Sequence, residues 1–190
     1  MALRTLTAAA LMLAFTAAAP KTNVIVFSPW SASGLQPAFT VVARVKGSCF
    51  TNSISTGRAD AWRCMVGNDI YDPCFASASG SVVACADDPF ARRVRLVTLD
   101  KAVSKGKAPA AGFPSSKDEP WALRLSTGEV CQFITGATDE VQGMRLNYGC
   151  KGNDYIVGFP VRSASVWTGH FIVWPGKKQL KPVPIATAVF

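Results

Sequence analysis

The sequence predicts a mostly β protein with an antiparallel sandwich or barrel-like fold, in two similar halves that disulfides stabilise. Short segments of alternating apolar and polar residues are separated by clusters of Gly, Asn, Asp, Ser and Pro, a pattern typical of strands joined by turns. Of the six cysteines, four lie in the first half and two in the second. The 190 residues suffice for one sizeable domain or two small ones.

Residues 1–19 have the three parts of a secretory signal peptide. Arg4 provides the positive charge, residues 6–15 form the apolar stretch, and the alanine-rich end offers a cleavage site, which we place after Ala18. Spanning a bilayer takes about 20 apolar residues, so this stretch is too short, and we expect no transmembrane segment in the mature chain. The protein is therefore expected outside the cytoplasm, in the periplasm, at the cell surface or secreted.

The first half, residues 20–101, places strand-like segments around a turn-rich region that holds four cysteines. Residues 39–46 alternate between apolar and basic side chains, imperfectly because of Val42, which predicts a half-buried strand. Asp60 can cap one helical turn at residues 60–65. Further β-type segments are expected at residues 23–27, 81–85 and 93–99.

Residues 102–120 are rich in Pro, Gly, Ser, Ala and charged residues, which predicts a linker or long surface loop. The second half, residues 121–175, again has short alternating segments with turns between them. The tail, residues 176–190, is basic and contains prolines, so we expect it to be extended and exposed. The strands of the second half are expected at residues 121–125, 129–134, 144–150, 155–159 and 165–174.

The cysteines are predicted to form disulfides, because an exported chain enters an oxidising compartment and their number is even. Metal binding is the rival interpretation, but His170 is the single histidine and no C-x-x-C occurs, so we expect neither a metal nor a cofactor. Each bridge would contribute about 2–4 kcal/mol. The six residues are Cys49, Cys64, Cys74, Cys85, Cys131 and Cys150.

A sequence echo between the halves suggests how the cysteines pair. In each half one cysteine follows a glycine, and a second precedes Gly-Asn-Asp and a Tyr/Ile pair. Cys131 and Cys150 lie on neighbouring β-type segments, so a bridge between them is sterically reasonable. By the echo Cys49 pairs with Cys64, which leaves Cys74 for Cys85. This connectivity and the structural repeat behind it are hypotheses.

The formal net charge of +8 predicts an anionic partner or simply good solubility. Six basic residues fall on the non-core side of alternating strands and would form a solvent-facing stripe if those strands share a sheet. The plainer interpretation is a solvated sheet face whose charges discourage edge pairing. The partners we expect are an envelope protein or an anionic envelope polymer, and not a nucleic acid. The stripe comprises Arg44, Lys46, Arg93, Arg95, Arg124 and Arg145.

No catalytic signature is present. A Ser–His–Asp site would need His170, and no G-x-S-x-G supports one. A carboxylate pair could hydrolyse a glycoside, but most of the acidic residues occupy turn-like contexts where they cap backbone groups. The acidic candidates are Asp69, Asp72, Asp87, Asp88, Glu119, Glu129, Asp139, Glu140 and Asp154.

The segments GSCF, DAWRC, GNDIYDPCF, GEVC, TGAT and NYGC are similar to those of exported bacterial proteins with a six-cysteine, tryptophan-containing β-rich module. The resemblance covers residues 45–167 and implies an extracytoplasmic module, with some similar segments attached to the outer side of receptor-type proteins. It implies no catalytic residue. We therefore expect an exported, non-catalytic envelope module, binding or structural, or an accessory subunit of a surface complex; the alternative is a small secreted hydrolase acting on envelope polymer.

Overall fold

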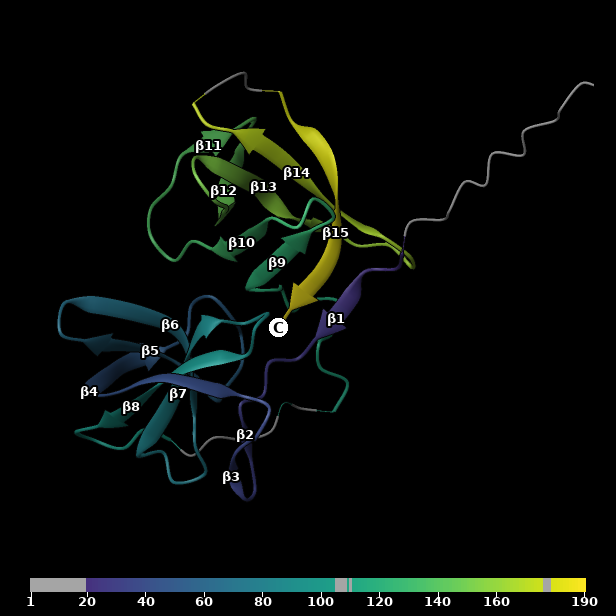
Figure 1. Ribbon diagram of the computed structural model, residues 1–190. Helices are drawn as coiled ribbons and strands as arrows, with labels where there is room; N and C mark the ends of the chain where they lie inside the picture. Colours follow the sequence, from purple (N-terminus) through teal and green to yellow (C-terminus); the bar gives the residue numbers. More distant parts are fainter. Residues whose placement is uncertain (1–19, 105–108, 110, 176–178) are drawn as a thin grey trace, which may run out of the picture.

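The computed structural model describes residues 20–104, 109, 111–175 and 179–190, and within these ranges every regular element is a β-strand. Two closed barrels, one of five strands and one of six, account for most of the strands (Figure 1). The prediction of a barrel-like β fold in two disulfide-stabilised halves is thereby confirmed. The expected signal peptide lies outside the described residues. No helix in the described part of the chain is long and apolar enough to cross a bilayer.

The five-stranded barrel is a meander in which each strand pairs with the next in antiparallel fashion. Directions alternate along a meander, so its first and fifth strands run the same way and the barrel closes through a parallel pairing of β4 with β8. The helical turn expected at residues 60–65 is wrong, because this segment pairs on both edges as β5. The strands are β4 (Thr40–Asn52), β5 (Ala61–Val66), β6 (Asp69–Ala76), β7 (Val82–Asp88) and β8 (Arg93–Leu99).

Two disulfides fill the interior of this barrel. Cys49 lies directly opposite Cys64 and Cys74 opposite Cys85, and each pair is bonded. The sulfur atoms of Cys64, Cys74 and Cys85 all lie within 4.8 Å of one another, so the two bridges are neighbours. The other buried residues of this cluster are aliphatic, namely Ala76, Val83, Val97 and Leu99, and the half-buried Trp62 and Tyr71 pack against them.

The six-stranded barrel closes through an antiparallel pairing of β15 with β9, as an even number of alternating strands requires. Its disulfide joins Cys131 to Cys150, so all three bridges have the predicted connectivity. Its strands are β9 (Ala122–Leu125), β10 (Val130–Phe133), β12 (Met144–Gly149), β13 (Asp154–Val161), β14 (Trp167–Val173) and β15 (Lys181–Val189), with β11 (Glu140–Val141) paired to β12.

The end of the chain is a barrel strand, and the expectation of an exposed tail is wrong. Ile185, Ala188 and Val189 are buried, and β15 pairs along its length with β14 and β9. Lysine and proline at residues 181–184 conceal this apolar pattern in the sequence. Of the tail, residues 176–178 lie outside the described part of the chain.

The N-terminal segment belongs to both barrels, so the predicted unit at residues 20–101 needs correction. β1 (Asn23–Ile25) pairs in parallel with residues 187–189 of β15. The pairing of β14 with β15 covers only residues 181–185. The chain then crosses to the five-stranded barrel and forms the hairpin of β2 (Trp30–Ser31) and β3 (Gly34–Leu35). Figure 1 shows β1 and the C-terminus between the barrels.

A shared apolar cluster joins the barrels. Phe27 packs edge-on against Trp121 at 5.5 Å between ring centres, and it also contacts Phe75 at 5.3 Å. Residues of the outer face of the five-stranded barrel are therefore buried by residues of the other barrel. The buried members are Phe27, Ala61, Phe75, Ala84, Val94, Leu96, Trp121, Ala122 and Val189, called the junction cluster below.

The described part of the predicted linker at residues 102–120 packs against the six-stranded barrel. Phe113 contacts the ring of Phe190 at 6.1 Å. Arg162 donates hydrogen bonds to the main-chain oxygens of Ser115, at 3.0 Å, and Asp118. This stretch is therefore a docked loop, and residues 105–108 and 110 lie outside the described part.

Candidate functional site

The six basic residues predicted to form one stripe divide between the two barrels. Arg44 and Lys46 lie on β4, whose neighbour β8 carries Arg93 and Arg95. The remaining two lie on strands of the six-stranded barrel, Arg124 on β9 and Arg145 on β12. The condition for a single stripe, a shared sheet, is therefore met only within the five-stranded barrel.

Arg95 lies on the inner side of its barrel, and its expected place on the solvent face is wrong. It is opposite Cys85, so its side chain shares the face that carries the disulfides. Its guanidinium lies 5.0 Å from the centre of the Tyr71 ring, and among the described residues its buried Nε has no hydrogen-bond partner. Sequence alternation failed here because the flanking Val94 and Leu96 are also buried, on the outer side, by the junction cluster.

Two other arginines are engaged in holding the fold. Arg145 donates hydrogen bonds to the main-chain oxygens of Ile134, at 2.6 Å, and Gly136, at 2.5 Å. Arg124 of the six-stranded barrel lies 4.5 Å from the ring centre of Phe90, which belongs to the turn between β7 and β8. Arg145 therefore fixes the loop after β10, and Arg124 contributes to the contact between the two barrels.

Arg44 and Lys46 remain as exposed cations on the outer face of β4. Neither takes part in an ion pair among the described residues, whereas the exposed Arg93 lies 3.4 Å from Asp87. The two side chains point the same way because alternate residues of a strand share a face. They are thus the part of the predicted stripe that is available to an anionic ligand.

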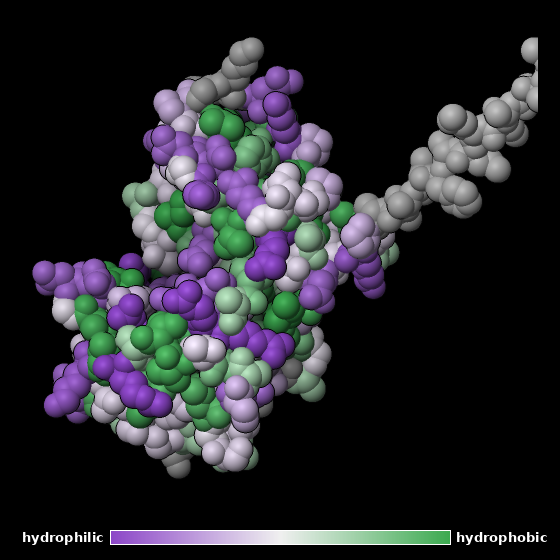
Figure 2. Space-filling model, in the orientation of Figure 1, coloured by the Kyte–Doolittle hydropathy of each residue, from purple (hydrophilic) through white to green (hydrophobic). Residues whose placement is uncertain are grey.

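The same face of the barrel continues into exposed apolar side chains. Phe50, Met65 and Ile70 have exposed fractions of 54%, 40% and 48%. Met65 lies opposite Ser48 of β4 on one side and Ile70 of β6 on the other, so the apolar side chains sit on three adjoining strands. Figure 2 shows hydrophobic and hydrophilic residues next to one another over this barrel. We define Arg44, Lys46, Phe50, Met65 and Ile70 as the outer β4–β6 face.

Acidic groups near this face are few and partly engaged. Asp72 of β6 accepts hydrogen bonds from Ser55, at 2.8 Å, from Ser53, and from the main-chain NH of Ile54, at 3.1 Å. Its carboxylate thereby fixes the loop that follows β4. Asp69, beside Ile70, is exposed at the start of β6.

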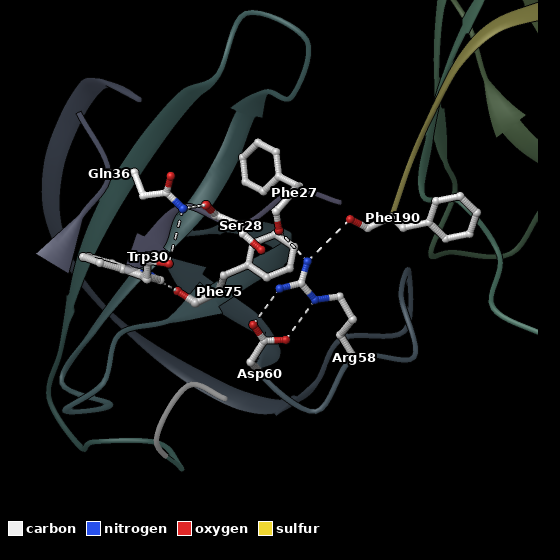
Figure 3. Close-up of polar contacts among 8 residues, drawn as sticks. All are labelled: Phe27, Ser28, Trp30, Gln36, Arg58, Asp60, Phe75 and Phe190. Carbon is white, nitrogen blue, oxygen red and sulfur yellow. Dashed lines mark hydrogen bonds and ion pairs between the residues drawn. The ribbon is translucent and has the colours of Figure 1, made fainter. Parts of the chain in front are cut away.

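A buried ion pair lies at the junction of the barrels (Figure 3). Arg58 pairs with Asp60 through two hydrogen bonds, Nε to Oδ1 at 2.9 Å and NH2 to Oδ2 at 2.7 Å, and their side chains are 2% and 10% exposed. Arg58 also donates to the main-chain oxygens of Phe27 and, at 3.5 Å, Phe190, and it lies 4.4 Å from the ring centre of Phe75. The guanidinium therefore connects the five-stranded barrel to the segment that follows β1 and to the residue that follows β15.

Two surface hollows adjoin this ion pair. One of about 260 Å³ includes Trp30, another of about 490 Å³ includes Phe113, and both are lined by Arg58 and Asp60. Arg58 and Asp60 form hydrogen bonds with each other, and Arg58 also donates one to a main-chain oxygen. The Trp30 indole NH donates to the oxygen of Phe75 at 2.7 Å. The polar groups of the hollows are thus occupied within the protein.

His170 does not lie in a catalytic arrangement. On β14 it faces Val157 of β13 and Pro182 of β15, and within the described part of the chain its side chain makes no hydrogen bond. No serine and aspartate are joined to it, so the described geometry gives no support to a Ser–His–Asp site.

Glu129 and Asp154 form a carboxylate pair that is also unsuited to glycoside hydrolysis. Burial raises the pKa of Glu129, and repulsion by the Asp154 carboxylate, together with a hydrogen bond to it, raises that pKa further. Carboxyl groups in hydrogen-bond contact are closer than the about 5 Å that separates those of retaining glycosidases. Burial likewise raises the pKa of Glu119, whose partner Arg162 lies at 3.1 Å and opposes the rise.

Comparisons with known proteins give no functional assignment. No protein-family model matches the chain, and no curated protein or solved structure matches it either. The resemblance to exported modules therefore remains a prediction.

Sequence reasoning missed the apolar half of the outer β4–β6 face and the buried ion pair. Phe50 could have been identified, because it follows Cys49 in a strand and adjacent residues point to opposite faces. With the cysteine directed inward, the phenylalanine must face outward. Arg58 and Asp60 lie in a loop, and nothing in their local sequence indicates that both are buried.

Proposed function

We propose that this protein is an exported, non-catalytic module of the cell envelope that binds an anionic envelope component through Arg44 and Lys46. Three disulfides fit a protein that folds in an oxidising compartment. The net charge of +8 favours association with anionic material. An envelope protein with an acidic surface and an anionic polymer are both partners of this kind.

The observation that carries the proposal is a pair of exposed cations that form no ion pair with any residue in the described part of the chain. Arg44 and Lys46 are exposed, and the ion pairs among the described residues involve other side chains. Cations held side by side on a rigid strand can engage an anionic partner without first breaking an internal salt bridge. Arginine adds a planar fork that suits phosphate or carboxylate groups.

Sedimentation of the oxidised protein with an isolated envelope fraction tests this proposal. Wild-type protein should co-sediment at low salt and lose retention as salt rises to physiological strength, where the Debye length falls to about 8 Å. The variant Arg44→Glu/Lys46→Glu should lose retention. The matched control is Lys151→Glu/Lys181→Glu, which reverses two exposed lysines of the other barrel.

Equal retention of Arg44→Glu/Lys46→Glu and wild type across the salt range would contradict the proposal. Reversal of Arg95 is not a suitable test, because that side chain lies on the inner side of the barrel beside Tyr71. Protease treatment of the fraction before mixing separates the two partners: lost retention indicates an envelope protein, and preserved retention indicates a non-protein component.

A further inference from the structure

We infer that the anionic component is a lipid surface and that the outer β4–β6 face contacts it. This inference rests on the proposed function and names the chemical class of the partner. It follows from the combination of charged and apolar side chains on one face of one barrel, which a purely ionic partner does not require.

The apolar part of the face is arranged for contact with an apolar phase. Phe50, Met65 and Ile70 project from three adjoining strands and are 40–54% exposed. Two of them, Met65 and Ile70, are direct cross-strand neighbours. Clustered exposed apolar side chains on a soluble domain mark a surface that another body covers.

The cations lie on the same side of the barrel as these apolar side chains, where lipid headgroups would contact them. Arg44 and Lys46 share the outer side of β4 with Phe50, and the guanidinium of Arg63 lies 5.9 Å from the ring centre of Phe50. Interfacial segments typically combine basic residues at headgroup level with aromatic and aliphatic side chains that enter the acyl boundary. Asp69 is the exposed acidic group nearest to Ile70 in the sequence, and it lies at the end of the β5–β6 hairpin.

The shape of this face favours a lipid surface over a peptide or a hydrated polymer. β4 pairs with β8 at residues 40–47 and with β5 at residues 48–52, so its unpaired edge is divided between the two sides of the strand. Two short edges of this kind suit an added peptide strand less well than one continuous edge does. Neither Phe50, Met65 nor Ile70 lines any of the hollows described above. A hydrated anionic polymer would engage the cations but would gain nothing from three apolar side chains that lie beside them.

Co-sedimentation with synthetic vesicles tests the inference. The wild-type protein should bind vesicles of phosphatidylglycerol and phosphatidylcholine, and should bind phosphatidylcholine alone much more weakly. Phe50→Ser and Met65→Ser should each weaken binding to anionic vesicles by roughly tenfold, because each loses an apolar side chain from the contact. Arg44→Gln and Lys46→Gln should each weaken it by about fivefold.

Matched controls come from the other barrel. Val173→Ser removes an apolar side chain that is 56% exposed on β14, and Lys181→Gln removes an exposed cation on β15. Both should bind as the wild type does. Urea unfolding of every variant, with the disulfides intact, verifies that the changes at exposed positions leave the fold unchanged.

Vesicle binding of Phe50→Ser and Met65→Ser at the wild-type level would overturn the inference. Wild-type protein that sediments with the envelope fraction but not with anionic vesicles would also overturn it, while the proposed function would stand with a polymer or protein partner. Failure to sediment with either material would refute both proposals.

Discussion

The interiors of the two barrels are packed with different kinds of residue. The buried centre of the five-stranded barrel consists of disulfides and aliphatic side chains, with Trp62 and Tyr71 only half-buried against it, whereas large side chains are fully buried in the six-stranded barrel, among them Leu123, Tyr148, Ile156 and Phe190. Barrel diameter grows with strand number, so the smaller barrel has less room to bury aromatic rings completely. In the small barrel, disulfides therefore occupy the central positions that large side chains occupy in the larger barrel.

The sequence echo marks where the barrels are built alike and where they diverge. In both, a cross-strand disulfide precedes a Gly-Asn-Asp turn, and the turn glycines Gly67 and Gly152 have φ values of 60° and 75°. β5 continues to Val66, past the fully buried Cys64, whereas β12 ends just before the half-buried Cys150. Each bridge joins one fully buried cysteine to one half-buried cysteine, Cys64 to Cys49 and Cys131 to Cys150, so the two bridges differ in their position along the strands and not in their burial.

Removal of the disulfides should produce the largest difference between the barrels. The bridges of the five-stranded barrel close loops of 15 and 11 residues, and that of the six-stranded barrel a loop of 19. Each disulfide adds about 3 kcal/mol to the free energy of unfolding by constraining the unfolded chain. Alanine at all four cysteines of the small barrel should therefore lower this free energy by about 6 kcal/mol. Alanine at Cys131 and Cys150 should cost about half as much.

Hydrogen exchange resolved by peptide, together with urea unfolding, measures this difference. The four-alanine variant should lose protection in β4–β8 first, and the two-alanine variant should keep most of its protection in both barrels. Equal losses in the two variants would show that the small barrel does not depend more on its bridges than the large one does.

Arg58 tests whether the barrels are independent. Its side chain comes from the five-stranded barrel but donates to Phe27 and Phe190, next to the other barrel. Arg58→Met would leave the Asp60 carboxylate buried without its partner, which costs about 3–5 kcal/mol. Exchange should therefore accelerate in β1 and β15 as well as in the small barrel.

The control for this prediction removes both charges. Arg58→Met/Asp60→Leu should recover much of the loss, because replacing a buried pair by apolar residues is often close to neutral. A single variant that loosens only the small barrel would show that Arg58 does not couple the two.

Structural features that depend on residues close together in the sequence could be predicted, and those that depend on contacts between distant residues could not. Alternation and turn residues located most strands, and the echo paired the cysteines as the structure does. β15 was missed because prolines hide its pattern, and Arg95 was misplaced because both faces of β8 are covered. The burial of Arg58 depends on contact with residues far along the chain, which no local pattern records.

The smallest effect on stability is expected from a substitution of Glu129, which lies two residues before Cys131. At the matching position of the small barrel, two residues before Cys49, the sequence has Gly47. Burial and the neighbouring Asp154 raise the pKa of Glu129 above its usual 4.5 in the folded protein. A carboxyl group with a raised folded pKa adds stability below its unfolded pKa and loses it as pH rises through the folded value. Its ionised form is therefore a cost to folding at neutral pH.

Glu129→Gln should consequently stabilise the protein at pH 7, and the gain should disappear as the pH falls below about 4.5. Solvent screening at this partly exposed position keeps the gain below about 1 kcal/mol. Urea unfolding at a series of pH values measures it, with Glu140→Gln on β11 as the control for loss of one negative charge. The gain should appear as slower exchange in β10 and β13 and leave β4–β8 unchanged, because the small barrel has a glycine at the matching position. A loss of stability at neutral pH would mean that Glu129 is held by favourable contacts that outweigh its repulsion by Asp154.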